Sequence, residues 1–321
     1  MDATWSRRPA TAVSRLRGRS LLLLSARDLL AAAEEEQILL VALVAPAPAA
    51  SAGFARAARD AGAPLLLARP SGAADEMGPE ETRDDAAFVE SALRAADELH
   101  FRGPFALLKE PPRAGSAVPE RDRIQREIDA GFTGVAMATS PEGAPAARDA
   151  ALVAATVCQM ELGLEIVPLG GSPELAADLV KQLRSRGAAP SALRLPEPDA
   201  ISIAELGPIA ISTTSETAPA DLLRRGVQQL VAAGPFLRAL QRAAPGDLLD
   251  RLQGWADEHG ATLEQAAARH QRLLRDLSGP EQEKLEALCC FEALELFARA
   301  GARKTGPRIA ERVGKLVAKE G

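Results

Sequence analysis

The stretch RDRIQREIDAGFTGVAMATS (Arg121–Ser140) gives the clearest indication of the fold class. Charged and apolar residues alternate with a helical period over Arg121–Gly131, and a short apolar run typical of a buried strand follows at Thr133–Ala138. Gly131 stands between them, where a residue that tolerates the left-handed conformation often ends a helix. A helix that ends at a glycine and leads directly into a strand is typical of proteins built from alternating strands and helices.

The same alternation extends in both directions from this stretch. It predicts eight short strands, at Ile38–Val44, Pro64–Ala68, Phe105–Leu108, Thr133–Ala138, Leu164–Leu169, Ala192–Leu195, Pro208–Ser212 and Gly226–Ala232. Amphipathic stretches such as Glu80–Leu99 and Pro145–Leu162 separate them and predict helices. Eight such units favour an α/β fold, a closed (β/α)8 TIM barrel. A doubly wound open sheet stays open as an alternative, although no Gly-x-Gly-x-x-Gly motif follows the first strand.

The length of the chain, 321 residues, exceeds the roughly 200 to 250 residues that such a barrel needs. We expect a basic, flexible leader over residues 1–19, the barrel over 20–245 and a helical extension over 246–321. Within the extension the strand pattern stops. Four helical segments follow instead, at 246–258, 261–276, 279–300 and 305–319. Ser278–Glu281 (SGPE) predicts the start of the third, because serine caps helices and proline suits a first turn.

Composition narrows the class of function. The formal net charge of −6 argues against a nucleic-acid-binding protein, although both ends of the chain are locally basic. We expect the basic face of the last helix to be solvated; its residues are Lys304, Arg308, Arg312, Lys315 and Lys319. No apolar run reaches the ~18 to 20 residues of a membrane helix, so we expect no membrane span. The three cysteines have neither metal-site nor disulfide spacing, and we expect a cytoplasmic protein with buried thiols.

Several of these segments resemble, in order and spacing, the class II metal-dependent fructose- and tagatose-bisphosphate aldolases. Ile128–Ser140 (IDAGFTGVAMATS) is similar to the family's A-G-F-x-S-V-M-x-D-G-S motif on its fourth strand. Ser25–Leu30 is similar to the family's leading helix, Ala61–Leu67 to the entry of its second strand, and Phe105–Leu108 to its third strand. The resemblance covers about residues 25–245 and implies the barrel fold.

The same resemblance implies a degenerate member of that superfamily, without the metal-binding histidines. In the family, three histidines hold a zinc ion that polarises the substrate carbonyl, while an aspartate moves the proton. Here Glu110 stands at the position of the aspartate, Pro111 at that of the first histidine and Ser212 at that of the third. Pro196–Asp199 offers no histidine for the second position. We therefore expect no metal site of that kind and no cofactor.

The carboxyl ends of the strands, where (β/α)8 enzymes hold their active sites, offer candidate residues. Lys109 is a catalytic candidate because a desolvated lysine forms Schiff bases with carbonyl substrates, and Glu110 is a candidate proton carrier; a structural ion pair explains both equally. The candidates for binding phosphate oxygens are Gly170, Gly171 and Ser172 after the fifth strand, and Ser212, Thr213, Thr214 and Ser215 after the seventh. Ordinary turns and helix caps explain these groups as well, and Glu216 would oppose an anion.

Our leading hypothesis is a non-catalytic class II aldolase-like barrel that acts as a binding, regulatory or assembly subunit. The resemblance supports it, since the family includes accessory subunits that resemble catalytic aldolases. We expect a protein partner or a homo-oligomer, leave a small phosphorylated ligand open, and do not expect nucleic acid. The alternative is a lyase or aldolase that acts on a small carbonyl substrate, phosphorylated or not, through Lys109 or an unrecognised metal site.

Overall fold

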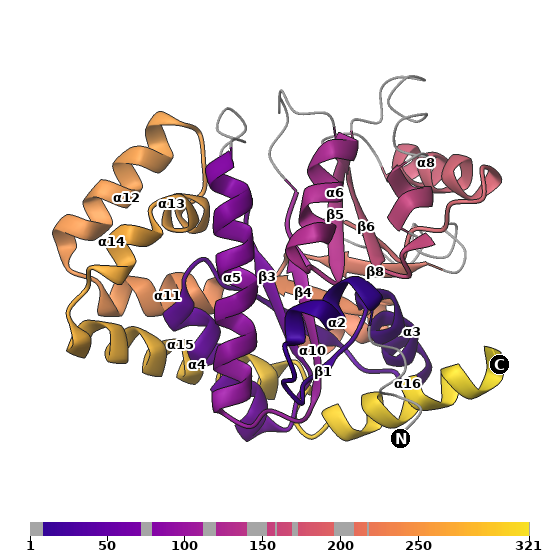
Figure 1. The fold of residues 1–321 in the computed structure, drawn as a ribbon, viewed down its shortest axis with the longest axis horizontal. Coiled ribbons are helices and arrows are strands. Elements are labelled where there is room, and N and C mark those ends of the chain that lie inside the picture. The colour runs from indigo at the N-terminus through magenta and orange to yellow at the C-terminus, as the bar shows by residue number, and fades with distance from the viewer. Residues whose placement is uncertain are drawn as a thin grey trace.

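The centre of the molecule is a closed parallel β-barrel surrounded by helices (Figure 1). This computed structural model describes residues 9–71, 79–111, 120–139, 153–157, 159–168, 173–195, 209–216 and 218–320. The barrel strands are β2 (Leu40–Val44), β3 (Leu65–Arg69), β4 (Pro104–Lys109), β5 (Gly134–Thr139), β6 (Gly163–Pro168), β7 (Ala192–Arg194), β8 (Ala210–Thr213) and β9 (Gln229–Ala232). They pair in the order β4-β3-β2-β9-β8-β7-β6-β5, and β5 pairs with β4 to close the ring. The eight predicted strands are confirmed with shifts of a few residues at their ends, although Leu169 and Pro208 of two of them lie outside the described residues. The (β/α)8 barrel is confirmed, and the open-sheet alternative is wrong.

Helices cover the outside of the barrel. Those that follow β2, β3, β4, β6, β8 and β9 are, in turn, α4 (Pro48–Ala61), α5 (Pro79–Glu98), α6 (Glu120–Ala130), α8 (Pro173–Ser185), α10 (Pro219–Leu222) with the 3-10 turn η2 (Leu223–Arg225), and α11 (Gly234–Ala243). After α6, Gly131 adopts a φ of 106°, which favours glycine and ends the helix as predicted. Of the predicted helix Pro145–Leu162, residues 153–157 and 159 are helical, whereas 145–152 and 158 lie outside the described residues. None of the helices in the described ranges combines the length and apolar character needed to cross a bilayer.

Residues of each strand alternate between the barrel interior and the helix layer. In β4, Ala106 and Leu108 belong to the apolar cluster of the interior, whereas Leu107 belongs to the larger cluster between strands and helices. The same alternation places Lys109 on the helix side of the wall and Glu110 on the interior side. The two catalytic candidates are therefore separated by the barrel wall.

The floor of the barrel, at the amino ends of the strands, is closed by α3 (Ala26–Glu36). The Ser25 side chain accepts a hydrogen bond from the third residue of the helix and fixes its start. Ala26 then packs on the first residues of β5 and β6, because a Cβ added at Gly134 or Gly163 would lie 2.7 Å from the Ala26 Cβ. Because α3 fills this end of the barrel, we look for a functional site at the carboxyl ends of the strands.

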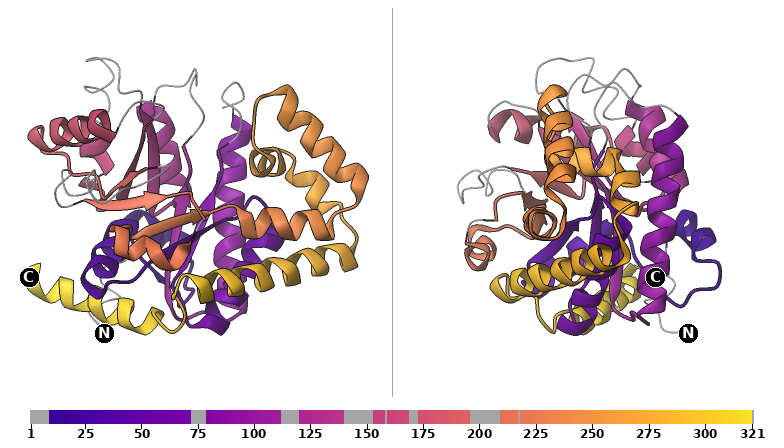
Figure 2. Two further views of the ribbon diagram at one scale, coloured as in Figure 1. Left: turned by 180° about the vertical axis from the view of Figure 1, so that it is seen from behind. Right: turned by 90° about the vertical axis from the view of Figure 1, so that its left-hand side faces the viewer.

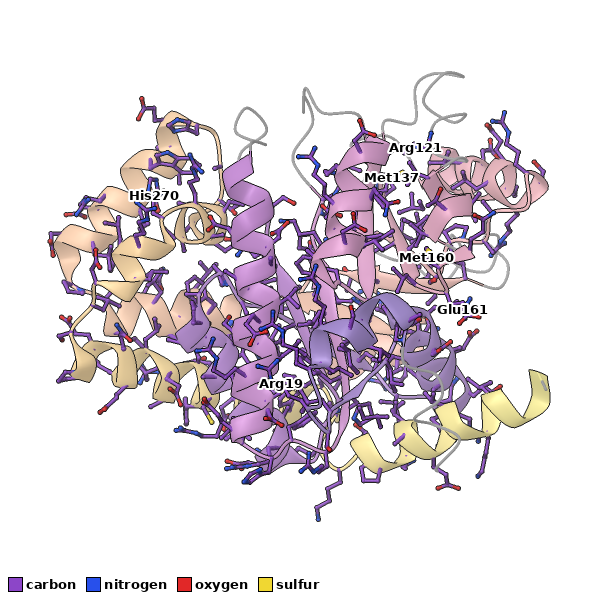
Figure 3. The ribbon with its side chains drawn as sticks, viewed as in Figure 1. Arg19, Arg121, Met137, Met160, Glu161 and His270 are labelled. Carbon is purple, nitrogen blue, oxygen red and sulfur yellow. The ribbon has the colours of Figure 1, made fainter. Side chains whose placement is uncertain are left out.

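The segment before α3 is packed on the barrel. α2 (Ala10–Leu16) buries Leu16, and the short strand β1 (Leu22–Leu23) pairs in parallel with the start of β4. Arg19 forms an ion pair with Glu90 of α5 (Figure 3). The part of the expected flexible leader that the structure describes is thus held by the core and by a charge pair, and the remainder lies outside the described residues.

Most of the helical extension forms a second layer on one side of the barrel (Figure 2). Its helices are α12 (Gly246–Glu258), α13 (Leu263–Arg269), α14 (Gln271–Arg275), α15 (Gly279–Arg299) and α16 (Gly306–Glu320). They lie where the sequence predicts, except that 261–276 is divided into α13 and α14. Ser278 and Glu281 form a capping box at the start of α15. α15 packs on α4 and α11, and so closely at Gly53 that a Cβ there would lie 2.3 Å from the carbonyl oxygen of Glu286.

The last helix, α16, returns beneath the barrel and lies along α3 (Figures 1 and 2). Ile309 and Val313 join the apolar cluster of the barrel interior and its floor. Arg308 and Arg312 form ion pairs with Glu36 at the end of α3. The face that we expected to be solvated is therefore partly paired, because a basic helix lies against the acidic end of another helix.

Candidate functional site

Four polar side chains meet inside the barrel near the carboxyl ends of the strands. They are Glu110 after β4, Glu165 of β6, Arg194 of β7 and Ser212 of β8, and we call them the lumen cluster. Each lies on the inward face of its strand; Arg194, for example, stands two residues after Ala192 of the interior apolar cluster. Closure of the barrel thus joins residues that are as far apart in sequence as Glu110 and Arg194.

The Arg194 guanidinium is held between the two carboxylates of this cluster. Its Nη1 and Nη2 donate to the two oxygens of Glu110, with Nη2 2.9 Å from Oε1. Its Nε and Nη2 donate to the two oxygens of Glu165, with Nε 3.1 Å from Oε1, and the Ser212 hydroxyl donates to the same Oε1. Burial by itself lowers the pKa of Arg194, but the charges and hydrogen bonds of the two carboxylates outweigh it and raise that pKa. Arg194 therefore remains a cation.

Lys109 lies on the other side of the wall, between β4 and the helices α5 and α6. Its Nζ is 2.8 Å from Asp85 Oδ1 of α5 and 6.0 Å from the centre of the Phe132 ring, and the residue is 1% exposed. Arg69, at the end of β3, donates to the same oxygen of Asp85. Burial would raise the pKa of Asp85, but Lys109 and Arg69 hold it below its ordinary value. Lys109 and Glu110 are neighbours in sequence that the fold does not bring together.

A second buried pair adjoins Lys109. Arg123 of α6 donates to Glu127 one turn later and to the carbonyl oxygen of Ala136 in β5, at 3.0 Å. Burial raises the pKa of Glu127 to about 7, against the opposing effects of Arg123 and Lys109. We call Arg69, Asp85, Lys109, Arg123 and Glu127 the helix-side network. It fixes α5 and α6 to the wall behind the site.

The serine and threonine candidates after β8 are divided between the core and the surface. Ser212 and Thr213 are buried, Thr213 Oγ1 accepts a hydrogen bond from the Ser215 amide at 3.2 Å, and Thr214 is exposed. This is a local turn that joins Ser215 to Thr213. Gly170, Gly171 and Ser172, the other candidates for anion binding, lie outside the described residues.

Glu216 is the next residue after Ser215, and its side chain lies against the start of α11. Its Oε1 accepts a hydrogen bond from the Gly234 amide at 2.6 Å, and its Oε2 lies 3.4 Å from Nη1 of Arg238. An amide at a helix start is a group that binds phosphate oxygens in other proteins. Here a carboxylate of the chain itself accepts from it, in keeping with the expectation that Glu216 would oppose an anion.

Arg194 and Glu165 are site residues that the sequence analysis missed. Each interrupts a predicted apolar strand, Glu165 between Leu164 and Ile166 and Arg194 after Leu193. Charged residues within such runs could have marked them, because a charge buried in a barrel needs a partner on another strand. Without the pairing of the strands, however, no feature of the sequence joins Glu165 to Arg194.

The residues present do not fit a zinc ion held as the resemblance implies. Proline and serine occupy two ligand positions, Pro111 and Ser212, and the glutamate at the position of the proton carrier is bonded to a guanidinium. Pro196–Asp199 lies outside the described residues. Within the ranges that the structure describes, no three histidine, cysteine, aspartate or glutamate side chains gather as metal ligands do. His270 lies against Trp255 in the α12–α14 region, on the opposite side of α5 from Met137 of β5 (Figure 3).

Solved structures share this architecture at low sequence identity. The YdjI aldolase from Escherichia coli K12 superimposes with a TM-score of 0.62 and 11% identity, over 88% of this chain and 99% of that one. A fructose-bisphosphate aldolase from Campylobacter jejuni gives a TM-score of 0.59 and 12% identity, over 88% and 96% of the two chains. A candidate fructose-1,6-biphosphate aldolase from Coccidioides immitis gives 0.59 and 11%, over 88% and 98%.

These likenesses establish the fold, an aldolase-like (β/α)8 barrel that extends over most of the chain. No protein-family model matches the sequence, and no curated protein matches it. The resemblance in the motifs and the likeness of the structures agree on the architecture.

Proposed function

We propose that this chain is a non-catalytic aldolase-like barrel that acts as a binding, regulatory or assembly subunit. The observation that carries the proposal is the Arg194 guanidinium between Glu110 and Glu165. A metal-dependent aldolase needs a Lewis acid beside the substrate carbonyl. Here the cation at that end of the barrel belongs to a side chain that makes four hydrogen bonds to the protein's own carboxylates. A guanidinium has five N–H groups, so this one retains little capacity to polarise a carbonyl.

Two neighbouring features support the proposal. The amine of Lys109 is enclosed between β4 and the helix layer and is bonded to Asp85. A carbonyl compound in the lumen would therefore be separated from this amine by the barrel wall. The carboxylate of Glu216 accepts from the helix amide that would otherwise suit a phosphate. Carboxylates of the chain itself thus bind the amine and the amide that a substrate's carbonyl and phosphate would need.

A protein partner or a second copy of the chain is the binding target that we propose. The helices after residue 246 add surface beyond the barrel, and Phe291 on α15 is 52% exposed. The resemblance to a family with accessory subunits favours the same role. A small phosphorylated ligand at the segments 170–172 or 212–215 remains a second proposal of the same class.

The experiment measures aldol cleavage and self-association on one preparation of the full chain. Fructose 1,6-bisphosphate and tagatose 1,6-bisphosphate are offered with Zn²⁺, Co²⁺ or Mn²⁺, triose phosphate is detected by a coupled assay, and the Campylobacter jejuni aldolase serves as the positive control. We expect no chelator-sensitive cleavage above background, and a sedimentation coefficient that rises with concentration. Chelator-sensitive cleavage of either sugar would overturn the proposal, whatever the sedimentation coefficient.

The alternative, a lyase that works through Lys109, is tested separately. Borohydride reduction in the presence of dihydroxyacetone phosphate or pyruvate fixes an imine as a covalent adduct, which intact-protein mass spectrometry detects. We expect no adduct on the wild-type chain. An adduct that is present in the wild type and lost in Lys109→Met would establish the lyase instead.

A further inference from the structure

The outer face of α15 exposes a large apolar side chain. Phe291 is 52% exposed, and Leu288, about one turn before it, is half-buried. Ala287, Leu294 and Ala298 extend the apolar stripe along the same side of the helix. The opposite side packs on α4 and α11, so the stripe lies at the outer edge of the molecule (Figures 1 and 2). An exposed apolar surface that is bounded by charged residues is typical of a site that binds another protein.

The residues along this stripe follow an order that is complementary to itself. Lys284, Leu288, Phe291 and Glu295 are separated by intervals of four, three and four residues. These are the intervals at which side chains of one helix face a second helix packed along it. Read in the reverse direction, the intervals stay the same, the anion takes the place of the cation and the phenylalanine takes the place of the leucine. Both charged residues are exposed.

We infer that α15 is the contact between two copies of this chain, and that the two helices lie antiparallel about a two-fold axis at the middle of this pattern. In a two-fold contact, if residue i meets residue j of the partner, then j also meets i. Phe291 of each copy thus packs on Leu288 of the other, and Lys284 of each copy lies beside Glu295 of the other. The inference rests on the proposed function, because it names a second copy as the partner of the assembly surface.

Charge complementarity favours this arrangement over a parallel one. A parallel pair in register would set Lys284 against Lys284 and Glu295 against Glu295, and like charges facing each other across a contact reduce affinity. The antiparallel pair sets opposite charges and apolar side chains together at the same time. A single helix pair is smaller than the stable interfaces that bury about 1,200 to 2,000 Å². We therefore expect a weak dimer, with a Kd on the order of micromolar.

Charge reversal tests the pairing of the two helices. Lys284→Glu sets two pairs of like charges across the contact, and Glu295→Lys does the same with the opposite sign. By sedimentation equilibrium of the full chain, we expect each variant alone to have a dimer Kd that is raised at least roughly tenfold. An equimolar mixture of the two should recover about the wild-type affinity, since each supplies the charge that the other lacks. The matched control is Arg272→Glu, which reverses an exposed charge on α14 and should leave the Kd unchanged.

Two further variants test the same contact. The double variant Lys284→Glu, Glu295→Lys restores opposite charges within one chain, so it should dimerise about as well as the wild type. Phe291→Ser removes the largest apolar side chain from both sides of the contact, and it should raise the Kd at least roughly tenfold. The three positions are on the surface, and circular dichroism of each variant verifies that the fold is kept.

The outcomes separate this inference from the proposed function. A wild-type chain that stays monomeric up to about 1 mM would overturn the contact. Single reversals that dimerise like the wild type, or a mixture that does not regain affinity, would also overturn it. Aldol cleavage is measured on the same preparations. Cleavage by a dimer that obeys the charge rules would overturn the proposed function alone, whereas a monomer without cleavage would overturn the contact alone.

Discussion

The two ends of the barrel are filled by different chemistry. At the floor, Ala26 packs on Gly134 and Gly163, and the contacts are apolar and close. At the carboxyl end, charged groups lie on both faces of the wall: the lumen cluster inside and the helix-side network outside. A close apolar contact is sensitive to an added atom, whereas a buried charge is sensitive to a lost partner. The two ends should therefore respond to opposite kinds of substitution.

At the charged end, the lumen cluster and the helix-side network differ in how fully their hydrogen-bonding groups are paired. In the lumen, Arg194 donates hydrogen bonds to both oxygens of Glu110 and to both oxygens of Glu165. In the helix-side network, Nη1 of Arg69 and Oε2 of Glu127 are buried without a hydrogen-bond partner. Among the described residues of this network, three cations face two carboxylates, so the loss of either carboxylate makes a buried group that is already positive more so. The largest effects are expected from this network.

Asp85→Asn should produce the largest loss. Asp85 is the common partner of Lys109 and Arg69, and its removal takes from both buried cations the carboxylate that they share. Breaking a buried ion pair typically costs about 3 to 5 kcal/mol, so we expect a decrease of that size in the free energy of unfolding, measured by urea titration at pH 7.

The matched control is Asp84→Asn, which makes the same change at the preceding, half-buried residue. It should alter the free energy of unfolding by about 0.5 kcal/mol or less. Equal losses in the two variants would mean that the pairs with Lys109 and Arg69 do not carry the stability of this end.

Glu127 should make stability depend on pH. Its pKa in the folded chain is raised by burial from its ordinary value of 4.5 to about 7, so the folded state binds the proton more tightly than the unfolded state. The stabilisation is complete below the unfolded pKa and is lost as the pH rises through about 7. Between pH 4.5 and 8 the free energy of unfolding should fall by about 3 kcal/mol relative to that of Glu127→Gln, which has no proton to lose.

Unfolding of wild type and Glu127→Gln in urea at several pH values measures this difference. Asp129→Asn, on the exposed face of the same helix, serves as the control and should follow the wild-type curve. A difference between wild type and Glu127→Gln that stays constant with pH would show that Glu127 does not titrate as a buried acid.

The strands could be predicted from the sequence because each is a local signal. Leu40–Val44 and Gly134–Ala138 are apolar over their whole length, and no distant contact is needed to recognise either run as a strand. The packing of residues 10–19 could not be predicted in this way. Whether Leu16 is buried and Arg19 is paired depends on α5, which is formed by residues far along the chain.

Gly163→Ala tests the apolar end and should cost about 1 to 3 kcal/mol, the usual range for an added methyl group in a filled core. A Cβ there would lie 2.7 Å from the Ala26 Cβ and 2.8 Å from the Arg27 amide nitrogen. The second of these atoms belongs to the backbone and cannot rotate away. Thermal and urea unfolding both measure the loss.

Gly254→Ala provides the contrast, since Gly254 lies within α12 and its Cβ would meet nothing within 4 Å. Alanine favours the helix, and this variant should gain about 0.5 to 1 kcal/mol. A loss at both glycines would indicate a general intolerance of substitution and would remove the distinction between the two ends of the barrel.

The site was less predictable than the fold, for a reason that Glu110 illustrates. Its position at the end of a strand could be read from the sequence, but its partner could not. The sequence places Lys109 beside it, whereas strand alternation turns Lys109 outward and closure of the barrel brings Arg194 from the far side. Alternation was available from the sequence and indicates which side chains share a face. Which strands meet across the lumen is known only once the ring is closed.

Glu216→Gln should give the smallest effect, a loss of about 1 kcal/mol or less. The variant keeps a group that can accept the Gly234 hydrogen bond but removes the negative charge from the start of α11, where a helix favours one. The pair with Arg238 adds little, because the arginine side chain is 41% exposed. Glu258→Gln, at the exposed carboxyl end of α12, is the matched control and should be neutral or slightly stabilising, since a negative charge there opposes the helix dipole. Urea unfolding at low and high salt compares them: the Glu216→Gln loss should shrink as salt screens the dipole, and a loss that does not depend on salt would assign it to the hydrogen bond instead.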